Sequence, residues 1–136
     1  MIGIYHDASE IITGDMPTPV KYFNADIRSA YKEVEHVAND RLLSQLPEDL
    51  RPVYEGIFHK QKTEEELLLR RMVKAADKLS ALIKCIEEIN SGNHEFDSAY
   101  DSTRATLEAM DVPAVDDFLN EFLPAYELTL DELQGC

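Results

Sequence analysis

Long apolar runs are missing from this sequence. No stretch of about 18 apolar residues occurs, which is the length that a membrane-spanning helix needs. The opening residues, MIGIYHDASE, lack both the basic start and the continuous apolar stretch of a secretory signal. These absences exclude an integral membrane protein and predict a cytoplasmic location.

Cysteine and positive charge are also scarce. The 2 cysteines, Cys85 in a helical pattern and Cys136 at the end, stand in no zinc motif and predict unpaired thiols in a reducing compartment. Because 13 Lys and Arg face 27 Asp and Glu, the formal net charge is −14. Such a field repels DNA and RNA, so a nucleic-acid polymer is not an expected ligand. A small phosphate ester is compatible with it only if a metal cation reverses the potential locally.

Strand-like alternation is missing as well, and apolar residues recur at three- and four-residue spacing, which predicts an all-α fold. The expected helices cover about residues 1–13, 24–46, 48–59, 63–90, 96–110 and 115–126, with a short terminal helix from 129. No repeat, low-complexity tract or linker separates them. We therefore expect one domain over residues 1–136.

Residues with capping or backbone preferences mark these boundaries. Capping boxes open the longest and the terminal helix, prolines fit early helical turns, and glycines end two helices. These residues are Thr63 with Glu66, Thr129 with Glu132, Pro52, Pro113, Gly14 and Gly92. Only Met1 to Gly3 are available to cap the first helix, and none of them is a good cap. The sequence is therefore expected to open inside a helix.

The helical stripes predict which apolar side chains face inward. In the first two helices and in those over 96–110 and 115–126, the expected inward residues are Ile4, Ala8, Ile11, Ile12, Ile27, Ala30, Tyr31, Val34, Val37, Ala38, Leu42, Phe96, Tyr100, Thr103, Leu107, Met110, Val115, Phe118, Leu119, Phe122 and Tyr126.

The run His6-Asp7-Ala8-Ser9-Glu10 has the most distinctive chemistry. A histidine ring and a neighbouring carboxylate can both bend toward one metal ion, and Glu10 shares their helix face. Asp77 is a second unusual residue, because it interrupts an apolar stretch of the longest helix. If it faces inward, a cation or hydrogen bonds must satisfy it.

Each of these features also has a plainer interpretation. An adjacent His-Asp pair is common on helices, and Glu10 could be a solvated helix charge. Asp77 could pair with Lys74 or Lys84, or face water. Asp15 could be an ordinary turn residue after Gly14.

The order of the motifs resembles the bacterial HD-domain 5'-deoxynucleotidases. The matching runs are HDASE at 6–10, TGD at 13–15, PTPVKYFN at 17–24, VKAAD at 73–77, KC at 84–85 and LTLDE at 128–132. This similarity extends over nearly the whole chain.

The resemblance implies a compact HD-domain bundle of about six helices, commonly dimeric, that removes phosphate from deoxyribonucleoside 5'-monophosphates with one divalent ion such as cobalt or manganese. By matching position, His6, Asp7 and Asp77 would be metal ligands. Glu10 would handle the attacking water or its proton. Asp15 would act in catalysis together with Glu10 and would hold the sugar and phosphate end of the nucleotide. Asp7 and Asp77 would also contact the substrate.

The chain departs from this pattern at its start. The family's site needs a further histidine from an earlier helix and a basic and aromatic pair, and nothing before Met1 supplies them. His36, His59 and His94 do not match that position and are expected at the surface or its boundary. We therefore expect an N-terminally incomplete domain with weakened metal affinity, exposed apolar surface, self-association and low activity. The loop between His59 and Thr63 also differs from the family's.

Two other functions stay open at this point. One is hydrolysis of another nucleotide by the same HD chemistry. The other is a non-catalytic helical interaction module that retains a dead site.

Overall fold

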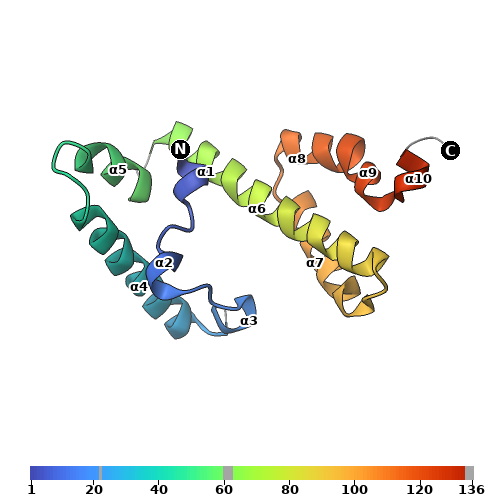
Figure 1. Ribbon diagram of the computed structural model, residues 1–136, viewed down its shortest axis with the longest axis horizontal. Coiled ribbons are helices and arrows are strands. Elements are labelled where there is room, and N and C mark those ends of the chain that lie inside the picture. The colour runs from blue at the N-terminus through green and yellow to red at the C-terminus, as the bar shows by residue number, and fades with distance from the viewer. Residues whose placement is uncertain (22, 60–62, 134–136) are drawn as a thin grey trace. The chain divides into compact units, whose positions relative to one another are not determined.

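The computed structural model describes residues 1–21, 23–59 and 63–133 (Figure 1). All secondary structure in these ranges is helical, which confirms the all-α prediction. The chain divides into two compact units, Met1–Arg70 and Arg71–Cys136. No helix in the described ranges combines the length and the hydropathy that a membrane crossing requires.

The first unit consists of short helices around one long one. Its elements are α1 (Ile2–Tyr5), α2 (Glu10–Thr13), α3 (Thr18–Lys21), α4 (Ala25–Ser44), α5 (Arg51–Phe58) and the start of α6 (Glu64–Asn90). The side chain of Asn24 caps α4 by accepting a hydrogen bond from the Ile27 backbone N–H at 2.8 Å. Pro52 lies in the first turn of α5, as predicted.

The predicted first helix is broken in two. Between α1 and α2 the backbone forms tight turns, with Ala8 N–H donating to Tyr5 at 3.1 Å and Glu10 N–H to Asp7 at 2.9 Å. The ring of His6 lies 2.8 Å from the carbonyl oxygen of Gly3, and such side-chain bonds compete with the helical ladder. Gly14 then ends α2 at φ 70°, which confirms the predicted stop.

Several predicted inward residues of the first unit are exposed. Tyr31 and Ala38 are buried on α4 as predicted, together with Leu43, which was not predicted. The predicted inward residues that are exposed instead are Ile4, Ile11, Ile12, Ala30, Val34 and Val37. Helical spacing identifies which side chains share a face, but only packing decides whether another element covers it.

The second unit packs around the later half of α6. Its further elements are η1 (His94–Phe96), α7 (Asp97–Glu108), α8 (Pro113–Asp117), η2 (Phe118–Phe122), α9 (Leu123–Glu127) and α10 (Leu130–Leu133). In Figure 1, α7 runs back along the end of α6, and α8 and α9 follow. The buried core comprises Ala75, Leu82, Ile86, Leu107, Val112, Val115, Leu119 and Leu123. Cys85 is a buried free thiol, as predicted, whereas Cys136 lies outside the described residues.

The stretch predicted as one helix over 115–126 contains a π turn. In η2 the Leu123 N–H donates to the carbonyl of Phe118, five residues earlier. Pro124 follows at once, and because proline has no N–H it cannot bond the carbonyl four residues before it. The wider turn keeps Leu119 and Leu123 buried but leaves Phe122 and Tyr126 exposed, contrary to the prediction.

Candidate active site

The turn between α1 and α2 brings His6 and Asp7 together. Nε2 of His6 lies 2.8 Å from Oδ2 of Asp7, and Nδ1 of the same ring lies 2.8 Å from the Gly3 carbonyl oxygen. Since a carbonyl oxygen only accepts hydrogen bonds, Nδ1 carries the proton in that contact. The Asp7 carboxylate oxygen likewise only accepts, so the contact at Nε2 is an ion pair when the ring carries a second proton, and a metal ion bound there would take the place of that proton.

This geometry fits two ligands of one divalent ion. Ligand atoms about 2.1 Å from a divalent ion are about 3.4 Å apart in a tetrahedral site and about 3.0 Å apart at right angles in an octahedral one. A backbone carbonyl bound to the other ring nitrogen is the usual means of orienting a ligating histidine. Both side chains remain accessible, with 35% of His6 and 55% of Asp7 exposed.

Aromatic packing holds this turn against α5. The Tyr5 ring, directly before His6, makes edge-to-face contacts with Tyr54 at 5.4 Å and Phe58 at 6.0 Å between ring centroids. The hydroxyl oxygens of Tyr5 and Tyr54 lie 3.4 Å apart. The position of His6 therefore depends on α5 as well as on its own turn.

Glu10 is the titratable group beside this pair. Partial burial raises the pKa of its carboxyl, and the negative charges of Asp7 and Asp15 raise it further, whereas Lys21 opposes the shift. Lys21 itself is paired with Glu35, with Nζ 2.8 Å from Oε1. A carboxyl whose pKa is raised toward neutrality is suited to accept and return a proton.

The loop that carries Asp15 is fixed to α4. Its first residue, Gly14, accepts hydrogen bonds at its carbonyl oxygen from the Thr13 hydroxyl at 2.9 Å and the buried Tyr31 hydroxyl at 3.3 Å. Asp15 follows directly and is exposed. The structure thus gathers His6, Asp7, Glu10 and Asp15 in one part of the first unit, and Glu10 is electrostatically coupled to both aspartates.

Asp77 belongs to the second unit and is exposed, so it is not the buried carboxylate that the apolar pattern suggested. Its neighbour Ala75 faces the core, and a side chain two positions further on a helix points about 200° away from it. The alternative of an ion pair with a lysine is not realised among the described residues: Lys84 pairs with Glu88 at 2.7 Å. A ligand role for Asp77 stays a prediction from the resemblance.

One group of potential ligands was not predicted. His36 and His59 both approach the carboxylate of Asp40, and a ligand atom from each residue lies within 4.8 Å of the others. The two histidines do lie at the surface or its boundary, as expected. The four-residue spacing of His36 and Asp40 on one helix face was the only sequence signal for this group.

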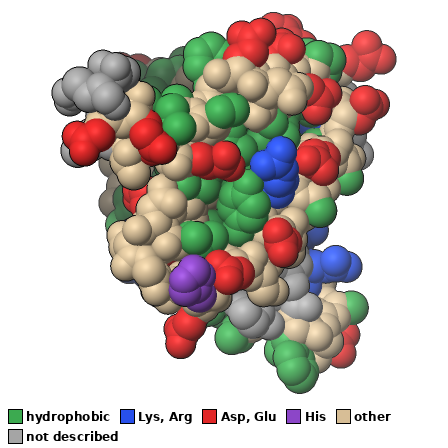
Figure 2. All heavy atoms as spheres, turned by 90° about the vertical axis from the view of Figure 1, so that its right-hand side faces the viewer, with side chains coloured by type: hydrophobic (Ala, Val, Ile, Leu, Met, Phe, Trp, Pro, Cys, Tyr) green, Lys and Arg blue, Asp and Glu red, His purple; other side chains and the backbone are tan. Residues whose placement is uncertain are grey.

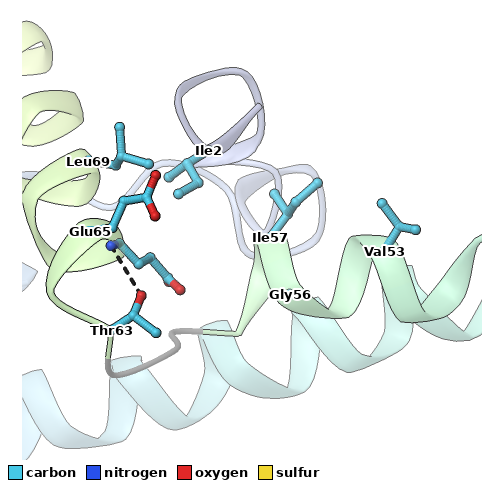
Figure 3. Close-up of a pocket in the computed structure, with 8 residues that line it drawn as sticks. Ile2, Val53, Gly56, Ile57, Thr63, Glu65 and Leu69 are labelled. Carbon is cyan, nitrogen blue, oxygen red and sulfur yellow. Dashed lines mark hydrogen bonds between the residues drawn. The ribbon is translucent and has the colours of Figure 1, made fainter.

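A surface hollow of about 360 Å³ lies between α1, α5 and the start of α6 (Figure 3). It is lined by Ile2, Val53, Gly56, Ile57, Thr63, Glu65, Glu66 and Leu69. The Glu66 carboxylate pairs with Arg70 at 2.5 Å, and Arg70 also donates to the Ile57 carbonyl at 3.0 Å. None of the predicted site residues lines this hollow, and its apolar and acidic walls do not suit a phosphate. Residues 60–62, in the loop that was expected to differ from the family's, lie outside the described residues.

Comparison with known proteins identifies the family to which the chain is related. The family described as 5'-deoxynucleotidase YfbR-like matches residues 1–126. A 5'-deoxynucleotidase of Vibrio atlanticus is 44% identical over 133 residues, covering 98% of this chain and 68% of the relative. A 5'-deoxynucleotidase of Vibrio vulnificus gives the same figures, and the 5'-deoxynucleotidase YfbR of Shigella flexneri is 43% identical, with 66% of it covered. This chain therefore belongs to the YfbR-like 5'-deoxynucleotidase family and spans about two thirds of the length of these relatives.

Proposed function

We propose that this chain is a metal-dependent phosphohydrolase that releases phosphate from deoxyribonucleoside 5'-monophosphates, with residues 1–136 acting as one HD-type domain. The family match over residues 1–126 carries the proposal. The paired ligand atoms of His6 and Asp7, 2.8 Å apart, support it.

In this proposal His6, Asp7 and Asp77 hold one divalent ion, such as cobalt or manganese. When bound, such an ion neutralises phosphoryl oxygens and makes hydroxide available near neutral pH. The donor set of one imidazole nitrogen and two carboxylates suits these metals. The net charge of −14 makes a cation necessary, because without it the chain would repel a phosphate.

The remaining catalytic and substrate-binding roles are assigned to Glu10 and Asp15, at the end of the HDASE turn (residues 6–10) and in the loop after α2. Glu10 takes the proton of the attacking water, a role for which its raised pKa is suited. Asp15 accepts a hydrogen bond from the sugar hydroxyl, since an ionised carboxylate only accepts. The hydrogen bonds of Tyr31 and Thr13 to Gly14 keep Asp15 in place.

The substrate class is tested by comparing phosphate release from a deoxynucleoside mono-, tri- and cyclic phosphate. We expect the monophosphate to be the preferred substrate. Release from the cyclic or triphosphate alone would assign another HD-type nucleotide hydrolase instead. No turnover of any of them, together with unchanged metal content in Asp7→Ala and Asp77→Ala variants, would favour the non-catalytic module.

We further propose that the chain forms a homodimer and has no nucleic-acid partner. Figure 2 shows acidic side chains spread over the displayed face, with few basic ones between them. This distribution agrees with the excess of 27 acidic over 13 basic residues and would repel a polyanion.

A further inference from the structure

Three metal-ligating side chains meet where α4 and α5 pack together. His36 and Asp40 lie four residues apart on α4, and His59 directly follows α5. Nε2 of His59 lies 2.9 Å from Oδ1 of Asp40, and Nε2 of His36 lies 3.7 Å from Oδ2. The carboxylate thus presents one oxygen to each imidazole.

We propose that His36, Asp40 and His59 form a second binding site for a divalent transition-metal ion, with zinc as the best fit. Two imidazoles and one carboxylate are a known ligand set for zinc, and such sites leave a fourth position to water. Tetrahedral ligands at about 2.0–2.2 Å from zinc are about 3.4 Å apart. The separations of 2.9 and 3.7 Å run to different oxygens of Asp40, and one ligand atom from each of the three residues lies within 4.8 Å of the others, so the side chains would close around the ion by rotation.

The surroundings of this cluster favour a cation. His36 and Asp40 are 65% and 56% exposed, so an ion can reach them, and His59 is 27% exposed at the edge of the packed elements. The overall charge of −14 raises the local concentration of cations at such a surface. The two rings contact each other edge to face at 4.8 Å, with both Nε2 atoms turned to the same carboxylate.

The site is distinct from the candidate active site, yet it is linked to it through α5. An ion at the cluster would fasten His59, at the end of α5, to α4. Tyr54 and Phe58 of the same helix hold Tyr5 next to His6. The second ion would therefore join the end of α5 to α4, stabilise the first unit and help to position His6.

The test is a zinc titration of the full, tag-free chain carrying His6→Ala, Asp7→Ala and Asp77→Ala, so that the proposed catalytic ion contributes nothing. Calorimetry should show one zinc ion per chain. Histidine side-chain NMR should show the Nε2 signals of His36 and His59 shifting with zinc. The signal of His94, which is 73% exposed and lies 3.4 Å from the carboxylate of Asp97, is the internal control and should not shift.

Ligand variants complete the test. Loss of an outer partner of a metal ligand already costs about 10–100-fold in affinity, so Asp40→Asn and His36→Ala should each weaken zinc binding by at least about tenfold. His94→Ala should leave it unchanged. If the triple background fails to fold, the same NMR titration of the unmodified chain answers the question.

Unchanged zinc affinity in a His36→Ala/His59→Ala variant would overturn the proposal. So would histidine signals that respond to pH but not to zinc, because the cluster would then be a proton-linked ion pair only. Absence of phosphatase activity would leave this proposal unaffected, since neither readout depends on turnover.

Discussion

Glu10 is the residue at which function and stability oppose each other. Its carboxyl is partly buried and lies near Asp7 and Asp15, and both effects raise its pKa. A raised pKa in the folded state means that ionisation weakens folding: the stabilising effect is full below the ordinary pKa of glutamate and is lost as pH rises through the folded value. At neutral pH the ionised Glu10 carboxylate, which the reaction needs, therefore lowers the stability of the metal-free protein.

Replacing Glu10 with glutamine should separate these two effects. We expect kcat to fall by about 10²–10⁴, the usual contribution of a positioned acid or base. The thermal midpoint of the metal-free protein should rise, since the amide keeps the shape without the charge. Glu33→Gln on the exposed side of α4 is the matched control and should change neither. A variant with full activity would remove Glu10 from the reaction.

The residues of the HDASE turn could be predicted individually because a contiguous motif carries them. The cluster of His36, Asp40 and His59 could not, since it forms only when the end of α5 folds back onto α4. Asp77 shows a second limit of prediction from the sequence. An apolar sequence around a residue does not reveal its angular position relative to the core, and this side chain is exposed.

At the scale of secondary structure, the loop after α2 depends on the backbone of one glycine. Gly14 has φ 70° and ψ 163°, a region that residues with a side chain avoid. A Cβ there would meet no atom within 4 Å, so any cost of substitution is backbone strain rather than a clash.

We expect Gly14→Ala to lower the free energy of unfolding by about 1–3 kcal/mol. It should also raise KM, because the following Asp15 is displaced. Gly92→Ala, at φ 88° after α6 and equally free of clashes, is the matched control. It should be destabilised in urea titrations but keep its KM. Equal KM effects in both variants would argue against a positioning role for this loop.

The capping box of α10, formed by Thr129 and Glu132, makes the stability of this helix depend on pH. The Glu132 carboxylate accepts hydrogen bonds from the backbone N–H and the hydroxyl of Thr129, both at 2.8 Å, and these bonds lower its pKa. Its stabilising effect is therefore present above the ordinary pKa of glutamate and is lost as pH falls through the lowered folded value.

An acid titration followed by the Thr129 amide signal should show this loss. We expect the signal to move toward its unfolded position below the ordinary pKa of glutamate. Glu132→Gln should abolish that titration, since the amide does not ionise. A titration that survives in the variant would assign it to another group.

Most helix boundaries were predictable because local chemistry sets them. The caps at Thr63 and Thr129 and the stops at Gly14 and Gly92 are confirmed, and the structure adds a cap at Asn24. The break between α1 and α2 and the π turn in η2 were not predicted. The break follows the contact between the His6 ring and the Gly3 carbonyl oxygen, and the π turn lies directly before Pro124.

At the scale of the whole molecule, exposed apolar surface coexists with a large negative charge. Val34 and Val37 on α4 are 51% and 65% exposed. They line a surface groove of about 430 Å³ together with Ile12, Ala30, Glu33, Ala38 and Arg41. Apolar patches of this kind favour association, whereas a charge of −14 opposes it.

We therefore expect sedimentation to show association that increases with protein concentration and with salt, because salt screens the repulsion. Val37→Asp should weaken it. Gln45→Asp adds the same charge at an exposed polar position of the same region and should weaken it less. A monodisperse monomer under all conditions would contradict both this expectation and the proposed dimer.

Metal-dependent phosphate release tests the central proposal most directly. The chain should be stripped with a chelator and assayed with a deoxynucleoside 5'-monophosphate before and after manganese or cobalt is restored. We predict release only with the metal, and its loss in Asp7→Asn, which keeps the size of the side chain but weakens the ligand. Equal release without metal, or by the Asp7→Asn variant, would contradict the account.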